Sequence, residues 1–405
     1  MDSLIEETGK KEILERAREH CFFVGMNDSG AELCKVNTPY GIAAIHYVQE
    51  ALGFKPDATF ISSPDMTITR NISRWKSGLG YGGKLSWGDG SRGLVILNPK
   101  PNACGMLVGG IETLPGMDEL IQRFHEMEKG RYEIDGIPLQ WDFYKSNHFV
   151  DLFEVKTVGS TLVNLPRYAF ILHSSSGELR ADNPAGMGIY YDKSEKVKEH
   201  YQMIKTPFGP IYFLTGSHAE EYYRAYEYAR EFAHRKRQLA AGILFGEYLE
   251  ISNETHQGLI SKNEMVLGCH YINKSETLFP VALRPDLPAY LVKGLPNYTP
   301  ETVEILGFMA RAKKLGVYDR LVNANILPHG GGYVLPDILG VNKVIEIEGG
   351  RYFEVDMQND RGKQIVSEVH ELPFEYRGRN VILRSLEIKS LEIIYKLIPK
   401  FILKI

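Results

Sequence analysis

The chain has 405 residues, of which 43% are hydrophobic and 24% charged, and its formal net charge is −4. This composition is that of an ordinary globular protein, long enough for one large domain or two to three smaller ones. The small negative charge excludes a global basic field, so a surface that binds nucleic acid has to be local.

The four cysteines include no CxxC pair, so we expect no disulfide framework and predict a reducing, cytoplasmic location. The N-terminus is charged and has a helical pattern, unlike a signal peptide. The sequence has no run of about 18 apolar residues, so no membrane span is expected.

The first 93 residues carry few regular patterns. Residues 10–20 have the spacing of an exposed amphipathic helix, and between residues 38 and 75 apolar runs mix with proline and aspartate turns. Residues 77–93 are rich in glycine but do not match GxxxxGK[ST]. This favours turn-rich strand connections over a phosphate-binding loop.

Further along the chain, several stretches are typical of strands. They are residues 94–98, residues 105–112, two apolar runs within 149–173, and residues 342–357. The last stretch has Gly349 and Gly350 between two alternating runs, which indicates a hairpin.

Helical spacing occurs in residues 116–130, 217–244 and 300–316. Ser217 and Glu220 have the spacing of a capping box at the start of the second helix. The apolar C-terminal stretch LEIIYKLIPKFILKI is interrupted by lysines and a proline, and we predict a packed terminal helix and tail. Without a repeat, a linker or a break in composition, the chain is expected to form one continuous mixed domain.

Four of the 12 histidines lie at or beside the ends of predicted strands, namely His148, His173, His256 and His329. Loops at strand ends often carry ligands and catalytic groups. Imidazole is the commonest metal ligand, and the thiolate of Cys104 is a suitable companion. Their spacing has no metal signature, because the ligands would come from distant parts of the chain. Any one histidine is more often a hydrogen-bonded surface or core residue.

His329 is followed by three glycines in the stretch NILPHGGGYVLPD. Without Cβ atoms, Gly330, Gly331 and Gly332 allow backbone N–H groups to approach a phosphate closely. The stretch therefore predicts an anion-binding turn around His329. The alternative is a loop that needs a positive φ, in which His329 has no role.

These segments resemble, in order, the motifs of the RtcB family of GTP-dependent RNA ligases. The matching segments are PNACGM, YKSNHFVD, LHSSSGEL, residues 221–240, His256–Gln257, HGGGY, ELPFEYR and PKFILKI. The resemblance extends from about residue 78 to the end, and the first 75 residues match poorly.

The resemblance implies an α+β fold, in which a single large mixed domain has strands that converge on a central metal-containing cleft. Residues 1–75 would be a divergent N-terminal segment packed on the core, and residues 76–405 the catalytic domain. It also implies an enzyme that joins an RNA 3′-phosphate to a 5′-hydroxyl in tRNA splicing or RNA repair. Its partners would be GTP, tRNA-like or broken RNA ends and an activating protein, with no membrane.

By the same resemblance, His329 is the nucleophile that takes GMP from GTP. The implied ligands of Mn²⁺, or of Zn²⁺ or Fe²⁺, are Cys104, His148, His173 and His256. The implied nucleotide-binding residues are Asn147, Gly330, Gly331, Gly332, Tyr376 and Lys404. Thiolate, imidazole and carboxylate ligands suit these ions.

The sequence also departs from the family pattern. Pro101 replaces a metal-binding aspartate, with Asn102 beside it, and Tyr333 replaces an arginine that can hold a phosphate with two bonds. Two other functions therefore remain open, a non-catalytic RNA-binding paralogue and a metal-dependent phosphoesterase. The basic stretch HRKRQ, residues 234–238, is explained by a helix C-terminus or, alternatively, by contact with RNA phosphates.

Overall fold

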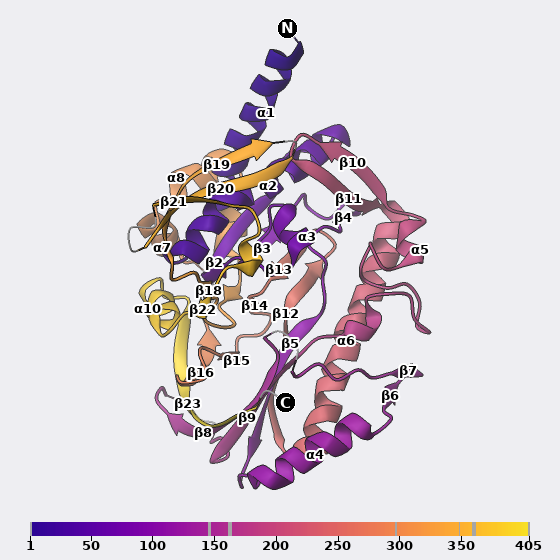
Figure 1. The fold of residues 1–405 in the computed structure, drawn as a ribbon, viewed down its shortest axis with the longest axis vertical. Coiled ribbons are helices and arrows are strands. Elements are labelled where there is room, and N and C mark those ends of the chain that lie inside the picture. Colours follow the sequence, from indigo (N-terminus) through magenta and orange to yellow (C-terminus); the bar gives the residue numbers. More distant parts are fainter. Residues whose placement is uncertain are drawn as a thin grey trace.

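The computed structural model describes residues 2–144, 147–160, 164–295, 298–347, 349–358 and 362–403, and only the backbone of residues 2–8. The fold is mixed α+β and is built on one large sheet with several smaller ones. Figure 1 shows the strands of the large sheet through the middle of the molecule, with the long helix α6 along one side and α1 projecting at the N-terminal end.

The large sheet has 11 strands, and all paired neighbours are antiparallel except β1 and β2. In spatial order the strands are β1 (Cys21–Phe22), β2 (Thr59–Thr67), β3 (Tyr81–Ser86), β13 (Glu264–Leu267), β12 (Leu249–Ser261), β5 (Cys104–Ile111), β9 (Tyr168–Ser174), β8 (Phe149–Thr157), β23 (Leu391–Leu403), β16 (Ala289–Gly294) and β15 (Leu278–Val281). Both ends of the chain therefore contribute to one sheet, and residues 1–75 supply two of its strands.

The centre of the sheet is covered by α6 (Gly216–Phe245), which contacts β5, β9 and β12. Its buried residues include Tyr222, Tyr226, Ala229 and Ala233, at the three- and four-residue spacing of one helix face. Helix α4 (Met117–Lys129) lies against α6 and buries Leu120, Phe124 and Met127. Because β5 is buried along its whole length, it is a continuous apolar run in the sequence.

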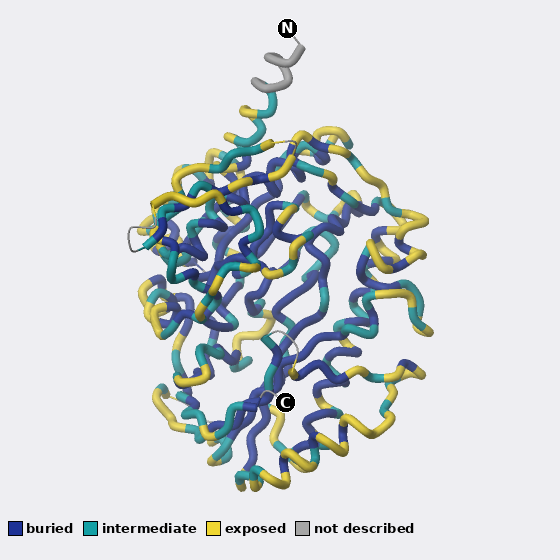
Figure 2. The backbone as a smooth tube through the Cα atoms, in the orientation of Figure 1, coloured by how far each residue is buried: buried dark blue, intermediate teal, exposed yellow. Residues whose placement is uncertain are grey.

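Helix α2 (Ser29–Ala51) covers the other end of the sheet and was missed by the sequence analysis. It is buried nearly all round, so it lacks the amphipathic period that predicts a helix. It also contains Pro39, which suggested a turn. Its start is set by Asp28, whose carboxylate accepts the N–H of Ala31 at 3.1 Å. Figure 2 shows this buried interior surrounded by exposed loops and helix faces.

The smaller sheets lie around the large one. They are β10 (Gln202–Thr206), β11 (Gly209–Thr215) and β4 (Leu94–Ile96); β19 (Ile338–Ile347), β20 (Gly350–Met357) and β21 (Lys363–Val366); β14 (His270–Tyr271) and β17 (Ile326–Leu327); β18 (Tyr333–Val334) and β22 (Glu375–Tyr376); and β6 (Glu133–Ile134) and β7 (Ile137–Pro138). The remaining helices are α1 (Asp2–Glu19), α3 (Ile72–Lys76), α5 (Glu195–Lys198), α7 (Pro300–Ile305), α8 (Met309–Leu315), α9 (Tyr318–Val322) and α10 (Asn380–Glu387), with 3₁₀ turns at Gly177–Leu179 and Val369–Glu371.

The prediction of a C-terminal helix and tail was wrong. Residues Leu391–Leu403 form β23, which pairs with β16 on one side and β8 on the other. Pro399 has no N–H for the ladder, and it lies where the register with β8 shifts between Pro399 and Phe401. A proline at this irregularity is compatible with a strand. Lys404 and Ile405 lie outside the described residues.

Two helix predictions also need correction. The helix predicted at 300–316 is broken into α7 and α8, because Gly307 adopts a φ of +70° between them. The capping box of Ser217 and Glu220 does not form, since α6 starts at Gly216 after Thr215 without a side-chain cap.

The strand and hairpin predictions at 94–98, 105–112, 149–173 and 342–357 agree with β4, β5, β8, β9, β19 and β20. Among the described residues, no helix has the length and apolar character needed to cross a membrane.

Candidate metal centre

The large sheet brings Cys104, His148, His173 and His256 together. Strands β12, β5, β9 and β8 are neighbours in that order, so His256, Cys104 and His173 lie side by side. His148 lies immediately before β8, and the next residue, Phe149, is paired with His173. Residues that are far apart in the sequence therefore meet because of strand order and register.

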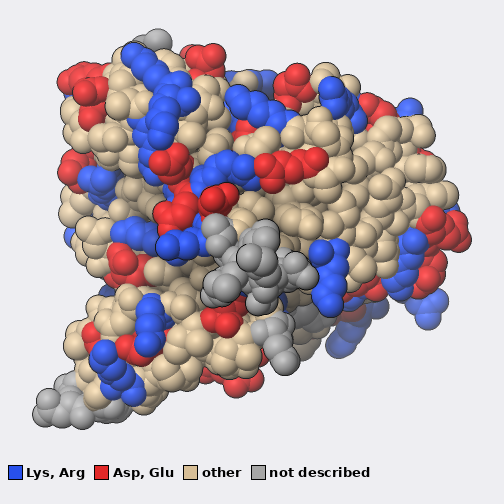
Figure 3. All heavy atoms as spheres, turned by 90° about the horizontal axis from the view of Figure 1, so that it is seen from above, with Lys and Arg blue, Asp and Glu red and all other residues tan. Residues whose placement is uncertain are grey.

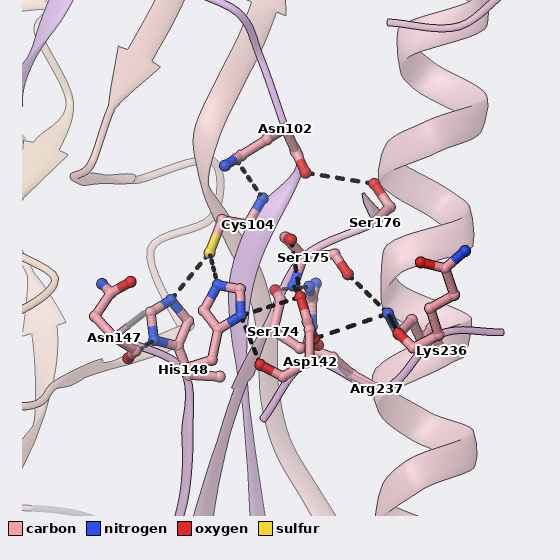
Figure 4. Close-up of polar contacts among 12 residues, drawn as sticks. Asn102, Cys104, Asp142, Asn147, His148, Ser174, Ser175, Ser176, Lys236 and Arg237 are labelled. Carbon is pink, nitrogen blue, oxygen red and sulfur yellow. Dashed lines mark hydrogen bonds and ion pairs between the residues drawn. The ribbon is translucent and has the colours of Figure 1, made fainter. Parts of the chain in front are cut away.

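The distances within this group are short (Figure 4). The sulfur of Cys104 lies 3.3 Å from Nε2 of His148 and 3.0 Å from Nε2 of His173. Nε2 of His173 lies 3.2 Å from Nε2 of His256. The ligand atoms of Cys104, His173 and His256 lie within 4.8 Å of one another, and all three residues are buried. One metal ion can reach all three residues.

Three further contacts orient the rings. Nδ1 of His173 lies 3.0 Å from the backbone oxygen of Asn147. Nδ1 of His148 lies 3.0 Å from a carboxylate oxygen of Asp142 and 3.2 Å from its backbone oxygen. Because Nδ1 donates a proton to these oxygens, Nε2 of each ring faces the thiol. Such partners commonly fix the orientation of metal-binding histidines.

The two histidines nearest the Cys104 sulfur differ in their pKa. Burial, together with the neighbouring His148 and His329, holds the pKa of His173 well below its usual range, so this ring is neutral. Burial also acts to lower the pKa of His148, but the Cys104 sulfur and the Asp142 carboxylate outweigh it and raise this pKa to about 10. Once His148 has lost its proton, the Cys104 sulfur and the neutral imidazoles form a donor set that suits Zn²⁺, Fe²⁺ or Mn²⁺.

His329 lies beside this group and is held by a buried carboxylate. Its ring centroid is 4.5 Å from that of His256. Its Nδ1 lies 2.8 Å from Oδ2 of Asp65, and the same oxygen accepts the backbone N–H of His329 at 3.0 Å. Nδ1 is thereby occupied, whereas the other ring nitrogen, Nε2, is not bound to Asp65.

The sequence analysis missed Asp65 and Asp142. Asp65 lies in β2, which is buried at every position, within the segment that matches the family poorly. Every position of β2 is buried, so the carboxylate of Asp65 needs a partner inside the protein. The sequence of β2 contains Ser62, Ser63, Pro64 and Asp65, and these residue types suggested turns instead of a strand.

The three glycines after His329 permit close packing. A Cβ at Gly331 would lie 2.6 Å from the backbone oxygen of Arg377, and Gly332 has a φ of +69°. The N–H of Gly331 is donated to the oxygen of Ala282 at 3.2 Å, and that of Gly330 to Asp65 at 3.4 Å. These two N–H groups bond to the protein and are not free to form the predicted anion-binding turn, while the positive φ of Gly332 agrees with the alternative of a loop that needs one.

A cavity of about 500 Å³ opens onto the cysteine–histidine group and His329. Asn147, Gly330, Gly331, Gly332 and Tyr376, the predicted nucleotide-binding residues that the structure describes, all line it. Tyr376 packs against Tyr333, with ring centroids 5.2 Å apart. Cationic side chains also line the cavity, namely Arg70, Arg74, Lys100, Arg180 and Lys193.

Asn102, beside Pro101, and Tyr333 both contact residues of the site. Asn102, next to Pro101, uses its side-chain oxygen to accept the N–H of Cys104 at 3.0 Å, so it positions the cysteine. Tyr333 is buried between Phe374 and Tyr376 and adds an aromatic ring to the cavity wall. Asn102 therefore positions Cys104, and Tyr333 contributes aromatic surface to the cavity.

The basic stretch 234–238 lies inside α6 and not at its C-terminal end. Two of its residues are too deeply buried to contact RNA. Lys236 and Arg237 are fully buried on α6. Lys236 lies 2.8 Å from Glu178, and Arg237 donates to the side chain of Asn253 at 2.7 Å. On the face shown in Figure 3, the charged side chains of both signs are interspersed.

His270, to which the sequence analysis assigned no role, also lies close to the site. Its ring centroid is 5.7 Å from that of His256. Nε2 lies 2.7 Å from the backbone oxygen of Pro280, and burial lowers its pKa to about 3. This ring is neutral, and its contacts are those of a packed core histidine.

Comparison of the chain with known proteins finds no family model that matches and no curated protein with significant sequence similarity. The fold and the site together define a mixed α+β protein with a buried cysteine–histidine group that can hold a metal ion.

Proposed function

We propose that the protein is a metal-dependent nucleotidyltransferase that acts on RNA ends in the manner of the RtcB ligases. The observation that carries the proposal is the Asp65–His329 pair, which lies against a buried group of metal-binding residues at one wall of a cavity large enough for a nucleotide. The order of the sequence motifs supports the same function.

In the first step, Nε2 of His329 forms a bond to the α-phosphorus of GTP. The bond from that phosphorus to the bridging oxygen breaks, and pyrophosphate leaves. Asp65 holds the Nδ1 proton and stabilises the positive charge that develops on the ring. The ring is oriented before the reaction, because Asp65 also binds the backbone N–H of His329.

The GMP then passes from His329 to an RNA 3′-phosphate, and a 5′-hydroxyl displaces GMP to join the strands. A divalent ion held by Cys104, His148, His173 and His256 would supply positive charge for the phosphate oxygens. Tyr333 and Tyr376 offer aromatic surface to the base, while Asn147 and the cationic wall offer polar contacts to the rest of the nucleotide. Residues 76–405 would carry these contacts, together with Asp65 from the segment before them.

The test is incubation with GTP labelled at the α-phosphate, with Mn²⁺, followed by denaturing electrophoresis. We expect an acid-labile label on the protein that is absent in His329→Ala and unchanged in His125→Ala, which replaces an exposed histidine outside the cavity. Bound metal without label, with release of phosphate from a phosphomonoester, would establish a phosphoesterase instead. RNA binding without metal or label would establish a non-catalytic paralogue.

A further inference from the structure

A second cavity, of about 490 Å³, shares a wall with the cavity beside the cysteine–histidine group, which we call the metal cavity. Three segments of the chain line both cavities, namely residues 70–77, 98–100 and 190–193. In the first segment, for example, Arg74 lines the metal cavity, while Trp75 and Lys76 line the second one. Asn98 lines the second cavity and Lys100 the metal cavity, and both belong to one turn, in which the N–H of Lys100 is donated to the backbone oxygen of Leu97 at 3.0 Å.

Aromatic rings form much of the second cavity. They are Trp75, Tyr191, Phe208, Tyr212 and Tyr352. Tyr191 and Tyr212 are stacked, with ring centroids 4.5 Å apart and an angle of 24° between the planes. Tyr352 is 38% exposed, so part of its ring is open to solvent. Aromatic faces of this kind stack with nucleobases and make little demand on base identity.

Positive charge is available next to these rings. Lys76 lines the second cavity with a side chain that is 64% exposed, and it forms a 3.2 Å ion pair with Glu368, which is 42% exposed. An exposed ion pair of this kind contributes little to stability, so Lys76 can exchange its partner for a phosphate. Arg70 and Lys193 are exposed cations that line the neighbouring metal cavity.

The floor of the second cavity is held rigidly by Arg351. This side chain is 8% exposed and donates to the side chain of Asn37 at 2.8 Å. It also donates to the backbone oxygens of Phe208, Trp75 and Lys76. The guanidinium thus ties α3 to the loop between β10 and β11. The shape of the cavity is set by these contacts before any ligand binds.

We propose that the second cavity binds an unpaired base of the RNA strand whose end lies in the metal cavity. That the ligand is an RNA strand follows from the proposed function, on which this inference rests. The shared wall places the two sites close together, the rings suit a base, and Lys76 suits the adjoining phosphate. A base has to leave its stack and its pair to enter a pocket, so the substrate class is single-stranded RNA next to the 3′-phosphate.

The test uses fluorescence anisotropy of the full chain with a 3′-phosphorylated single-stranded RNA of eight nucleotides, without GTP. A series of otherwise identical RNAs has one abasic site each, at successive positions from the 3′ end. We expect one or two positions near the 3′ end at which loss of the base weakens binding about tenfold. A duplex with the same 3′ end should bind about tenfold more weakly than the single strand.

Two variants connect the effect to the second cavity. Tyr352→Ser should weaken binding of the intact RNA about tenfold, as loss of the base does, and remove the sensitivity to the abasic site. Lys76→Glu should weaken binding of every RNA in the series. The matched controls are Ile365→Ser, which replaces an exposed residue of the same small sheet, and Lys389→Glu, which breaks another exposed ion pair with a glutamate. Both controls should bind like the unaltered protein.

Equal affinity for intact and abasic RNAs, or no RNA binding at all, would overturn the inference. Unchanged binding by Tyr352→Ser would do the same. The labelled-GTP experiment reports separately on the proposed function. Label on His329 together with insensitivity to abasic sites rejects the base pocket and keeps the ligase, whereas abasic sensitivity without label keeps the pocket and rejects the ligase.

Discussion

The carboxylate of Asp65 lies 2.8 Å from Nδ1 of His329, although the two residues are 264 positions apart in the chain. The same carboxylate oxygen accepts the backbone N–H of His329, and the Asp65 side chain is completely buried. One group therefore fixes both the ring and the loop that carries it. A histidine held in this way presents Nε2 in a constant direction, as a nucleophile requires.

The first prediction concerns this pair. Asp65→Asn keeps the shape of the side chain but removes the negative charge that stabilises a positively charged His329 ring, and it replaces one acceptor oxygen with an NH2 donor. We expect the rate of nucleotide labelling to fall by roughly 10²- to 10⁴-fold. Rapid-quench labelling measures the rate, and the bound metal should stay unchanged because Asp65 is outside the cysteine–histidine group. Labelling at the normal rate would remove Asp65 from the mechanism.

The second prediction concerns the metal. Cys104 contacts both His148 and His173 through its sulfur, so Cys104→Ala removes the central ligand of the group. Protein purified without added metal should lose most of its bound transition metal, as measured by mass spectrometry of the element. Cys21→Ala is the matched control, because Cys21 is also a free and buried cysteine but lies in β1. Equal metal content in the two variants would place the ion elsewhere.

The third prediction concerns pH. The folded state without metal raises the pKa of His148 from 6.5 to about 10, through the Cys104 sulfur and the Asp142 carboxylate and against the effect of burial. The stabilisation from this proton is therefore complete below pH 6.5 and is lost as the pH rises towards 10. Metal has to displace the proton, so metal binding should tighten over the same range.

Titration calorimetry with Mn²⁺ at pH 7.5, in buffers of different ionisation enthalpy, counts the protons that are released. The His148→Gln variant should release about one proton fewer than the unaltered protein. His218→Gln, which replaces an exposed histidine, should show no difference. An equal number of released protons in His148→Gln would mean that His148 carries no proton to displace.

The fourth prediction concerns the buried charges on α6. Lys236 lies 2.8 Å from Glu178 and 3.8 Å from Asp142, and its side chain is completely buried. Lys236→Met leaves these carboxylates without their cation and should lower the free energy of unfolding by about 3–5 kcal/mol. Denaturant titration measures the change. Lys198→Met, which breaks an exposed pair with Glu195, should leave this free energy nearly unchanged.

A companion variant separates charge from packing. If the loss in Lys236→Met comes from the unpaired carboxylate, the added change Glu178→Gln should restore part of the stability, because it neutralises the group left behind. A double variant that is less stable than Lys236→Met would assign the effect to packing of the lysine stem. The Lys236 nitrogen also lies 5.9 Å from the centroid of the Trp141 ring.

Local sequence patterns were reliable where one face of an element is buried. Helices α4 and α6 were predicted because their apolar residues recur at helical spacing. Helix α2 and strand β23 were not, because one is buried nearly all round and the other is an apolar run that fits a helix or a strand equally well. Period alone cannot distinguish such segments, since their neighbours in the fold decide their conformation.

The sequence by itself determined which side chains are available at strand ends, including Cys104, His173 and His329, and the glycines that let the loop of His329 pack closely. The tertiary structure alone decided that these residues meet and that Asp65 and Asp142 orient two of the histidines. The physical reason is that strand order and register in a sheet bring together residues from distant parts of the chain. No spacing along the chain encodes that proximity.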